Sequence, residues 1–242
     1  MKRFYVNFEI EVGNTYKIEG VEHNHIKNVM RMSMGNRLIL VCGDSFDYMA
    51  EIVGISKGDT KVIVLEKERN IYNSDKNVTV FQAMTKSDNM TLIIQKLTEL
   101  GVNTFIPFES EFVTSKDKFG KTAKMQEISN QSIKQCKRSI PMKVLDAIKF
   151  DELINALKDY DLVIFANECE KNDKLSELEF DSDKKIAIII GSEGGFSDTE
   201  ISKLIAAGAK SVTMGKRILR AETASIALAS VVMFKLGEWE YE

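Results

Sequence analysis

The sequence contains few of the residues that form disulfide frameworks or metal sites. Among 242 residues there are three cysteines and two histidines. Cys42, Cys136 and Cys169 lie far apart and form no Cys-x-x-Cys pair, and His23 and His25 have no Cys or Asp companions. Neither a disulfide framework nor a zinc site is expected from this pattern. We interpret the cysteines as packing residues and the histidines as surface or hydrogen-bonding residues.

Long apolar runs are also absent. No run reaches the roughly 18 residues that a membrane span requires, and the opening residues, MKRFYVNFEIEV, lack the long apolar core of a signal peptide. Apolar residues make up 44% of the chain and charged residues 29%, which argues against long disordered segments. We expect a soluble, cytoplasmic protein with one large domain or two modest ones.

The net charge of −3 argues against a strongly basic nucleic-acid-binding protein, but the charge is unevenly distributed. Residues 151–183 include eleven acidic and three basic residues, whereas residues 114–143 include eight basic residues against Asp117 and Glu127. The basic stretch could bind phosphates, or it could be the solvated face of a helix. The sequence leaves both interpretations open.

The first part of the chain is rich in β-branched and aromatic residues. Four short runs predict strands at residues 4–10, 37–42, 46–55 and 61–68. A helix predicted at residues 22–32 interrupts them and places Ile26, Val29 and Met30 on one apolar face. These signals predict a small β-rich domain.

The pattern changes at the polar segment 69–77, where we place the boundary between a first domain, residues 1–71, and a second, residues 72–242. Beyond it, apolar strands alternate with amphipathic helices. Strands are predicted at 78–84, 103–108, 161–168, 185–191 and 211–215, and helices at 88–101, 123–137, 197–208 and from 221 onward. This alternation indicates an α/β domain with a largely parallel sheet covered on both faces.

The sequence IAIIIGSEGGFSDTEI, which begins at Ile186, joins an apolar strand to a glycine-rich turn and then to a helix. Ser197 and Glu200 fit a capping box at the start of that helix. Open parallel sheets bind ligands at such turns, where glycines let backbone amides approach the ligand. GSEGG, residues 191–195, is neither a P-loop nor a GxGxxG motif, and Glu193 disfavours a polyphosphate. The turn therefore either holds a neutral or positive small molecule or merely reverses the chain.

A second segment, TMGKRILRAETASIALASVV, passes from a short strand through Gly215 into a cationic stretch and an apolar helix. Lys216, Arg217 and Arg220 are expected to cluster beside Glu222. A charge network at a helix start would account for these charges. The apolar residues of "RIL" in a loop favour the wall of a pocket. The helix is apolar nearly all round, which predicts burial in the core or at a subunit interface.

The pair GSEGGFSDTEI and MGKRILRAETA resembles the signature of the SPOUT class of RNA methyltransferases. More closely, it resembles the RsmE family, which methylates uridine N3 in 16S ribosomal RNA. The segments DNMTLIIQKLTELGV and KQCKRS resemble further blocks of that family, so the resemblance covers nearly the whole chain. It implies a PUA-like β-barrel RNA-binding domain followed by a SPOUT domain with a trefoil knot, an exception to the rule that chains avoid knots.

The resemblance also implies a cofactor, partners and site residues. These are S-adenosylmethionine bound in the second domain, 16S ribosomal RNA of the small subunit as substrate, and a homodimer. The residues implied to bind the cofactor are Gly191, Ser192, Glu193, Gly194, Gly195, Met214, Gly215, Arg217, Ile218 and Leu219.

Two departures from the family pattern occur. Ser192 stands where the family commonly has Pro, which retains the amides of the turn. Cys136 and Lys137 interrupt an expected Gln-Ser-Gly-Arg pattern, of which Gln135 and Arg138 are present. These departures leave the role of residues 134–138 less defined than that of the turn.

Methylation of uridine N3 requires loss of its proton or stabilisation of the anion that forms. Arg217 and Arg220 are the candidates for stabilising that charge or anchoring a phosphate, and Glu193 and Glu222 are the available carboxylates. In the first domain, basic residues are expected to contact RNA phosphates; they are Lys2, Arg3, Lys27, Arg31 and Arg37.

Two other functions are compatible with parts of the sequence. One is a non-catalytic RNA-binding or ribosome-associated protein that retains the fold. The other is an enzyme that binds a nucleotide in the glycine-rich turn, although the usual phosphate-loop lysine is absent.

Overall fold

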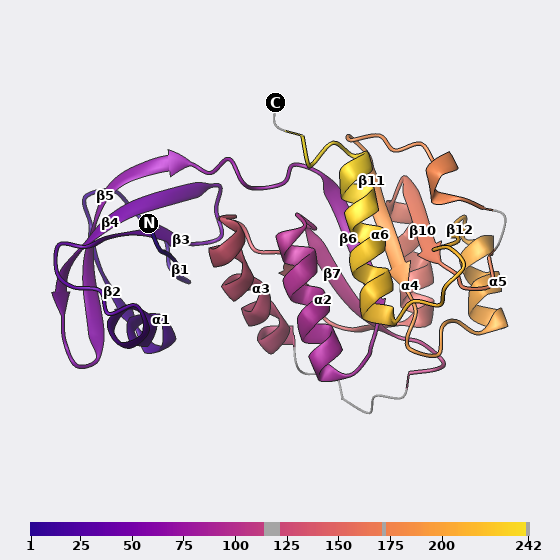
Figure 1. Ribbon diagram of the computed structural model, residues 1–242, viewed down its shortest axis with the longest axis horizontal. Coiled ribbons are helices and arrows are strands. Elements are labelled where there is room, and N and C mark those ends of the chain that lie inside the picture. The colour runs from indigo at the N-terminus through magenta and orange to yellow at the C-terminus, as the bar shows by residue number, and fades with distance from the viewer. Residues whose placement is uncertain (114–121, 171–172, 241–242) are drawn as a thin grey trace. The chain divides into compact units, whose positions relative to one another are not determined.

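The computed structural model describes residues 1–113, 122–170 and 173–240 (Figure 1). These residues form two compact units. The first consists of Met1–Asn73 together with Asn130–Pro141, and the second of Ser74–Ser129 together with Met142–Glu242. A later segment of the chain therefore completes the first unit, which the sequence pattern did not predict.

The first unit is built on a five-stranded sheet. Its strands are, in spatial order, β1 (Arg3–Tyr5), β3 (Arg37–Val41), β4 (Phe46–Ile55), β5 (Asp59–Arg69) and β2 (Thr15–Glu19). The pair β1–β3 is parallel and the other three pairs are antiparallel. Alternate residues along the strands point into a buried core that includes Phe4, Leu38, Ile52 and Val62. The sequence did not predict β2, because Ile18 is its one fully buried apolar residue.

The helix predicted at residues 22–32 is replaced by two shorter pieces. The helix α1 (Gly20–Asn24) leads into a π-helical turn (His25–Val29), in which the Met30 N–H donates to the His25 carbonyl at 2.8 Å. Ile26 is buried as predicted, but Val29 is 60% exposed. The wider π turn rotates Val29 off the apolar face, so that part of the prediction was wrong.

Two buried polar side chains of the first unit have partners. His23 Nδ1 lies 2.8 Å from Thr60 Oγ1, which confirms a hydrogen-bonding role for this histidine. The Tyr48 hydroxyl donates to Asp44 Oδ2 at 2.7 Å. Burial and the neighbouring Asp44 raise the pKa of the Tyr48 phenol, so it remains a protonated donor.

The second unit contains a seven-stranded parallel sheet. Its strands are, in spatial order, β12 (Lys210–Val212), β10 (Leu162–Ala166), β11 (Lys185–Ile190), β6 (Asn77–Ala83), β7 (Thr104–Glu109) and β8 (Lys143–Val144), and β9 (Ile148–Lys149) also pairs with β7. Each pair is parallel, which confirms the predicted α/β class. The apolar strand β11 lies between β10 and β6, as expected of a central strand.

Helices cover both faces of this sheet (Figure 1). They are α2 (Ser87–Glu99), α4 (Phe150–Ala156), α5 (Asp198–Ala206) and α6 (Ala221–Lys235). Of α3 (Thr122–Cys136), only the first part, up to Ser129, belongs to this unit, and its Met125 and Ile128 pack against the core. Ile186, Ile188 and Ile190 of β11 pack in one core with α2 and α6, whereas Ala187 and Ile189 pack in another with α4 and α5. The period of two along the strand therefore divides the core into two layers.

The sequence pattern missed α4 and the two short strands β8 and β9. The helix α4 is only seven residues long and places a single fully buried residue, Leu153, against the sheet, which is too little periodicity to detect. The trefoil knot implied by the resemblance stays a prediction. Within the described ranges, no helix is long and apolar enough to cross a membrane.

Candidate functional site

A cavity of about 570 Å³ opens in the second unit where β6, β10, β11 and β12 end. The carboxyl ends of parallel strands meet at one edge of a sheet, so the segments that follow them come together there. The wall is formed by parts of residues 166–169 after β10, 190–201 after β11 and 214–224 after β12, with Lys86 and Asn89 from the start of α2. The volume is in the range of about 300–1,000 Å³ that is typical of small-molecule sites.

The glycine-rich segment after β11 folds into a tight turn. The Gly195 N–H donates to the Ser192 carbonyl at 3.0 Å, and the Gly194 N–H donates to the Ser192 hydroxyl at 3.3 Å. Gly195 has a φ of +71°, which glycine adopts without strain. A Cβ atom on Gly191 would lie 3.1–3.2 Å from the backbone of Gly195. The two arms of the turn are thus in contact, and a side chain at Gly191 would force them apart.

Gln82 and Phe112 hold this turn from outside the cavity. The fully buried Gln82 donates from Nε2 to the Gly191 carbonyl at 3.2 Å. The Ser192 hydroxyl donates to the Phe112 carbonyl at 3.3 Å, and a Cβ atom on Gly194 would lie 2.9 Å from Phe112 Cβ. The glycines therefore serve close backbone approach as well as turn formation.

The Glu200 carboxylate joins the helix after the turn to a second loop. It accepts from the Ser197 N–H at 3.0 Å, while the Ser197 hydroxyl accepts from the Glu200 N–H at 3.2 Å, so the predicted capping box is confirmed. Glu200 also accepts from the Glu111 N–H at 2.9 Å, and it is 5% exposed. This second contact fixes the loop that carries Phe112, and the sequence pattern did not reveal it.

The segment between β12 and α6 forms the opposite wall of the cavity. Ile218 and Leu219 both line it, so the apolar wall expected from "RIL" is present. Arg220 is the exposed N-cap residue of α6, with an extended backbone and no side-chain cap. Glu222 follows in the first turn, and its Oε2 atom is buried with no hydrogen-bond partner among the described residues.

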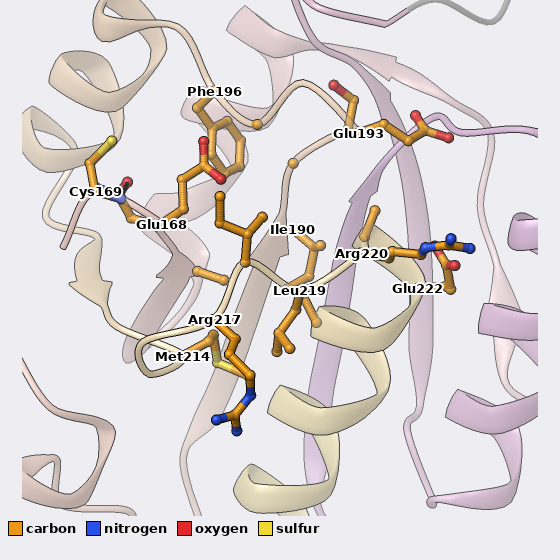
Figure 2. A pocket seen from close by; sticks show the side chains of 18 of the residues that line it. Glu168, Cys169, Ile190, Glu193, Phe196, Met214, Arg217, Leu219, Arg220 and Glu222 are labelled. Atoms are coloured by element: carbon orange, nitrogen blue, oxygen red, sulfur yellow. Dashed lines mark hydrogen bonds between the residues drawn. The ribbon is translucent and has the colours of Figure 1, made fainter. Parts of the chain in front are cut away.

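Figure 2 shows that the charged side chains of this segment diverge. Arg220 and Glu222 lie at one end of the cavity, and Arg217 lies near Met214 on the other side of Leu219. The expected cluster of Arg217 with Arg220 is therefore wrong. Residues 216–220 are not helical, because 216 and 217 form a bend and Arg220 has an extended backbone, so residues three apart do not share one helical face.

The structure brings the predicted site residues together with one exception. Gly194 faces Phe112 and does not line the cavity, whereas the other predicted cofactor-binding residues, with Arg220 and Glu222, do line it. Lining residues that were not among the predicted site residues are Lys86, Asn89, Ala166, Asn167, Glu168, Cys169, Ile190, Phe196, Asp198, Ile201, Lys216, Ala221 and Ala224. Of these, Lys216 was predicted only as part of the cationic stretch. The positions just after β6 and β10 could have been found by applying the same rule to them, since the carboxyl ends of all strands in a parallel sheet meet at one edge. Cys169 is exposed on the cavity, so its prediction as a packing residue was wrong.

Charges of both signs line the cavity. The cations are Lys86, Lys216, Arg217 and Arg220, and the carboxylates are Glu168, Glu193, Asp198 and Glu222. This balance suits a ligand with both charges better than a polyphosphate. In the part of the chain that the structure describes, no group of three His, Cys, Asp or Glu side chains is placed to hold a metal ion.

Comparison with known proteins assigns the chain to a family. A family model described as the RNA methyltransferase domain matches residues 73–233, which include the whole cavity, and a model described as the RNA methyltransferase PUA domain matches residues 18–65. The chain belongs to the RNA methyltransferase family.

Individual RNA methyltransferases are similar over nearly their full length. The ribosomal RNA small subunit methyltransferase E of Mesomycoplasma hyopneumoniae is 33% identical, covering 94% of this chain and 97% of the relative. That of Bacillus subtilis is 29% identical, covering 97% of each chain. A solved structure of ribosomal RNA small subunit methyltransferase E from Neisseria gonorrhoeae, bound to S-adenosyl methionine, is 27% identical with a TM-score of 0.87 and covers 97% of each chain.

We predict that Gly191→Ala opens the turn. The added Cβ would be 3.1–3.2 Å from backbone atoms of Gly195, which can move only if the turn widens. Overpacking of this kind costs about 1–3 kcal/mol of stability. Thermal denaturation should therefore show a lower midpoint, and amide hydrogen exchange at residues 192–197 should be faster.

The matched control for this substitution is Gly58→Ala, since a Cβ atom at Gly58 meets nothing within 4 Å. Equal midpoints and equal exchange rates for the two variants would contradict the close contact between Gly191 and the backbone of Gly195.

Proposed function

We propose that this RNA methyltransferase transfers a methyl group from S-adenosylmethionine to N3 of a uridine in 16S ribosomal RNA of the small subunit. The observation that carries the proposal is the cavity at the strand ends, which lies within the matched methyltransferase domain. A similar protein solved with S-adenosyl methionine bound, and relatives named for the small ribosomal subunit, support the cofactor and the substrate.

The residues of the cavity fit this cofactor. Ile190, Met214 and Leu219 provide apolar surface of the kind that packs against a purine ring. The buried, unpartnered Oε2 atom of Glu222 needs a donor, and a ligand that carries an ammonium group and hydroxyl groups can supply one. The amides of Gly194 and Gly195 already donate within the turn. Carbonyls and the remaining amides of the lining segments would therefore make most of the backbone contacts with the cofactor.

When bound, S-adenosylmethionine supplies an electrophilic methyl group on its sulfonium sulfur. The chain's own residues must position the uracil ring and deal with the proton on N3. We assign Arg220 to stabilising negative charge on the ring, because it lies exposed at the end of the cavity that also holds Glu222. Arg217, on the other side of Leu219, is assigned to an RNA phosphate. Glu193 and Glu222 are the two carboxylates available for proton removal.

The first unit supplies RNA affinity in this proposal, in keeping with its match to a PUA domain. Arg3 does not belong to the expected basic patch of this unit. Arg3 forms a buried pair with Asp47, its side chain being 7% exposed, so it cannot reach a phosphate. Lys2, Arg31 and Arg37 are exposed, and the half-buried Lys27 donates to the Ser56 carbonyl at 2.7 Å.

We further propose that the chain forms a homodimer through α2 and α6. These helices contact each other, and their outer surface exposes Leu92, Val231 and Phe234, with Trp239 packed against Phe234 at 5.9 Å between ring centroids. The opposite side of α6 is buried in the core, so this helix is not buried all round. A solvated apolar strip of this kind is typical of a subunit interface.

Transfer of labelled methyl from S-adenosylmethionine to small ribosomal subunits that lack the modification tests the reaction. Nucleoside analysis should recover the label as 3-methyluridine, with protein-free 16S RNA as a parallel substrate. An active relative in the same assay serves as the positive control. Absence of label from both substrates, with RNA affinity retained, would favour the non-catalytic RNA-binding function.

The roles of the two arginines predict different kinetic defects. Arg220→Ala should lower kcat by roughly 100- to 1,000-fold, since it removes a group that stabilises charge in the transition state. Affinity for S-adenosylmethionine, measured by titration calorimetry, should change little. Arg217→Ala should instead raise KM for RNA at nearly constant kcat. Equal losses of turnover and cofactor affinity in Arg220→Ala would contradict its assignment.

The dimer is tested by sedimentation equilibrium. The wild-type chain should sediment as a dimer, and Phe234→Lys should shift it toward monomer, because a desolvated charge at an interface is costly. Ile205→Lys is the matched control, since Ile205 is equally exposed, at 55% against 54%, on α5 at the other face of the sheet. A monomeric wild type, or equal dissociation by both variants, would refute the interface.

A further inference from the structure

Lys137 adopts a backbone conformation that is unfavourable for any residue except glycine. Its φ is +68°, and among the described residues only Arg31 shares a positive φ without being glycine. A Cβ atom in this left-handed region crowds the following carbonyl, whereas glycine adopts it freely. Lys137 is also one of the two residues that interrupt the Gln-Ser-Gly-Arg pattern of the family. The chain therefore keeps a lysine where the backbone favours glycine.

Hydrogen bonds on the carboxyl side of Lys137 hold this conformation. Asn70 Nδ2 donates to the Lys137 carbonyl at 2.9 Å and to Asp47 Oδ1 at 2.8 Å. The Asn73 side-chain oxygen accepts from the N–H groups of Ser139 and Ile140, each at 3.0 Å. Since α3 ends at Cys136 on the amino side and these bonds hold the chain on the carboxyl side, residue 137 cannot relax, and the bonds balance its strain.

The Lys137 side chain differs in its surroundings from two neighbouring cations of the first unit. Lys134 pairs with Glu22 at 2.8 Å, and Arg3 pairs with Asp47, so both are neutralised and largely buried. Lys137 is exposed, and no carboxylate of the described residues lies within ion-pair distance of it. Its Nζ atom lies 5.0 Å from the centroid of the Tyr72 ring. The ring supports an ammonium group that remains accessible to solvent.

We propose that Lys137, positioned by Tyr72, binds a backbone phosphate of the RNA substrate. A solvated ammonium group with no internal counter-ion attracts phosphate, and the strained backbone fixes the point from which the side chain extends. The inference rests on the proposed function, because it takes the substrate to be RNA. Tyr72 is a positioning residue here, acting through the lysine.

Three substitutions at residue 137 separate the effect of the side-chain charge from the effect of backbone strain. Lys137→Gly removes the charge and relieves the strain, Lys137→Gln removes the charge and keeps the strain, and Lys137→Arg keeps both. Binding to protein-free 16S RNA would be measured for the full-length chain over a series of salt concentrations. Thermal denaturation and S-adenosylmethionine affinity would be measured on the same samples.

Lys137→Gly and Lys137→Gln should each weaken RNA binding by roughly three- to tenfold at low salt and reduce the salt slope by about one. Lys137→Arg should bind nearly as well as the wild type. The melting temperature of Lys137→Gly should stay equal or rise by about 2–4 °C, whereas that of Lys137→Gln should not rise. Weaker RNA binding by a variant that is no less stable than the wild type excludes misfolding as the cause.

Unchanged RNA affinity and salt slope in Lys137→Gly, with an active wild type, would overturn the phosphate contact while leaving the proposed function intact. A wild type that neither binds S-adenosylmethionine nor transfers methyl would instead show that the proposed function fails. Loss of RNA binding in Lys137→Arg as severe as in Lys137→Gln would also overturn the inference, because a charge contact should survive that change.

Discussion

The parallel register between β6 and β11 is the constraint on which the rest of the second unit depends. It sets Ile190 beside Gln82, so both strands end at the same level and the Gln82 amide reaches the Gly191 carbonyl. The same parallel order brings the ends of β10 and β12 to that edge. Three loops that are distant in sequence thereby meet around one cavity. Without the β6–β11 register the glycine-rich turn would lose its backing amide, and without the β10–β11 and β10–β12 pairings it would lose its opposite wall.

The regular part of this architecture was predictable from local pattern. The all-apolar run of β11 predicted a central strand, and Ser197 with Glu200 predicted the start of α5, because both signals depend only on neighbours in sequence. The apolar wall formed by Ile218 and Leu219 was also predictable, since apolar residues between charges in a loop require a reason. Identification of the cofactor and substrate came from resemblance to a family rather than from these patterns.

What escaped prediction depends on contacts between distant residues or on side-chain direction. Glu200 could be recognised as a capping residue, but nothing in its neighbourhood shows that it also accepts from the Glu111 N–H. Arg217 and Arg220 are close in sequence, yet the non-helical backbone between them places them in different parts of the cavity. Arg3 was expected on the surface because the sequence cannot show that Asp47, on another strand, faces it. In each case a partner far along the chain decides the role of a residue.

Residues 130–141 have a consequence for how the protein is made. They supply the bonds from Lys134 to Glu22, from Ser139 to the Asp44 carbonyl and from Asn70 to the Lys137 carbonyl, all inside the first unit. As the chain emerges during translation, the first sheet is complete once β5 has appeared, but these partners are not. The amino-terminal unit therefore reaches its final form only after part of the following unit has been synthesised. Folding of the first unit is thus completed only while the second unit is being synthesised, although the two units have separate cores.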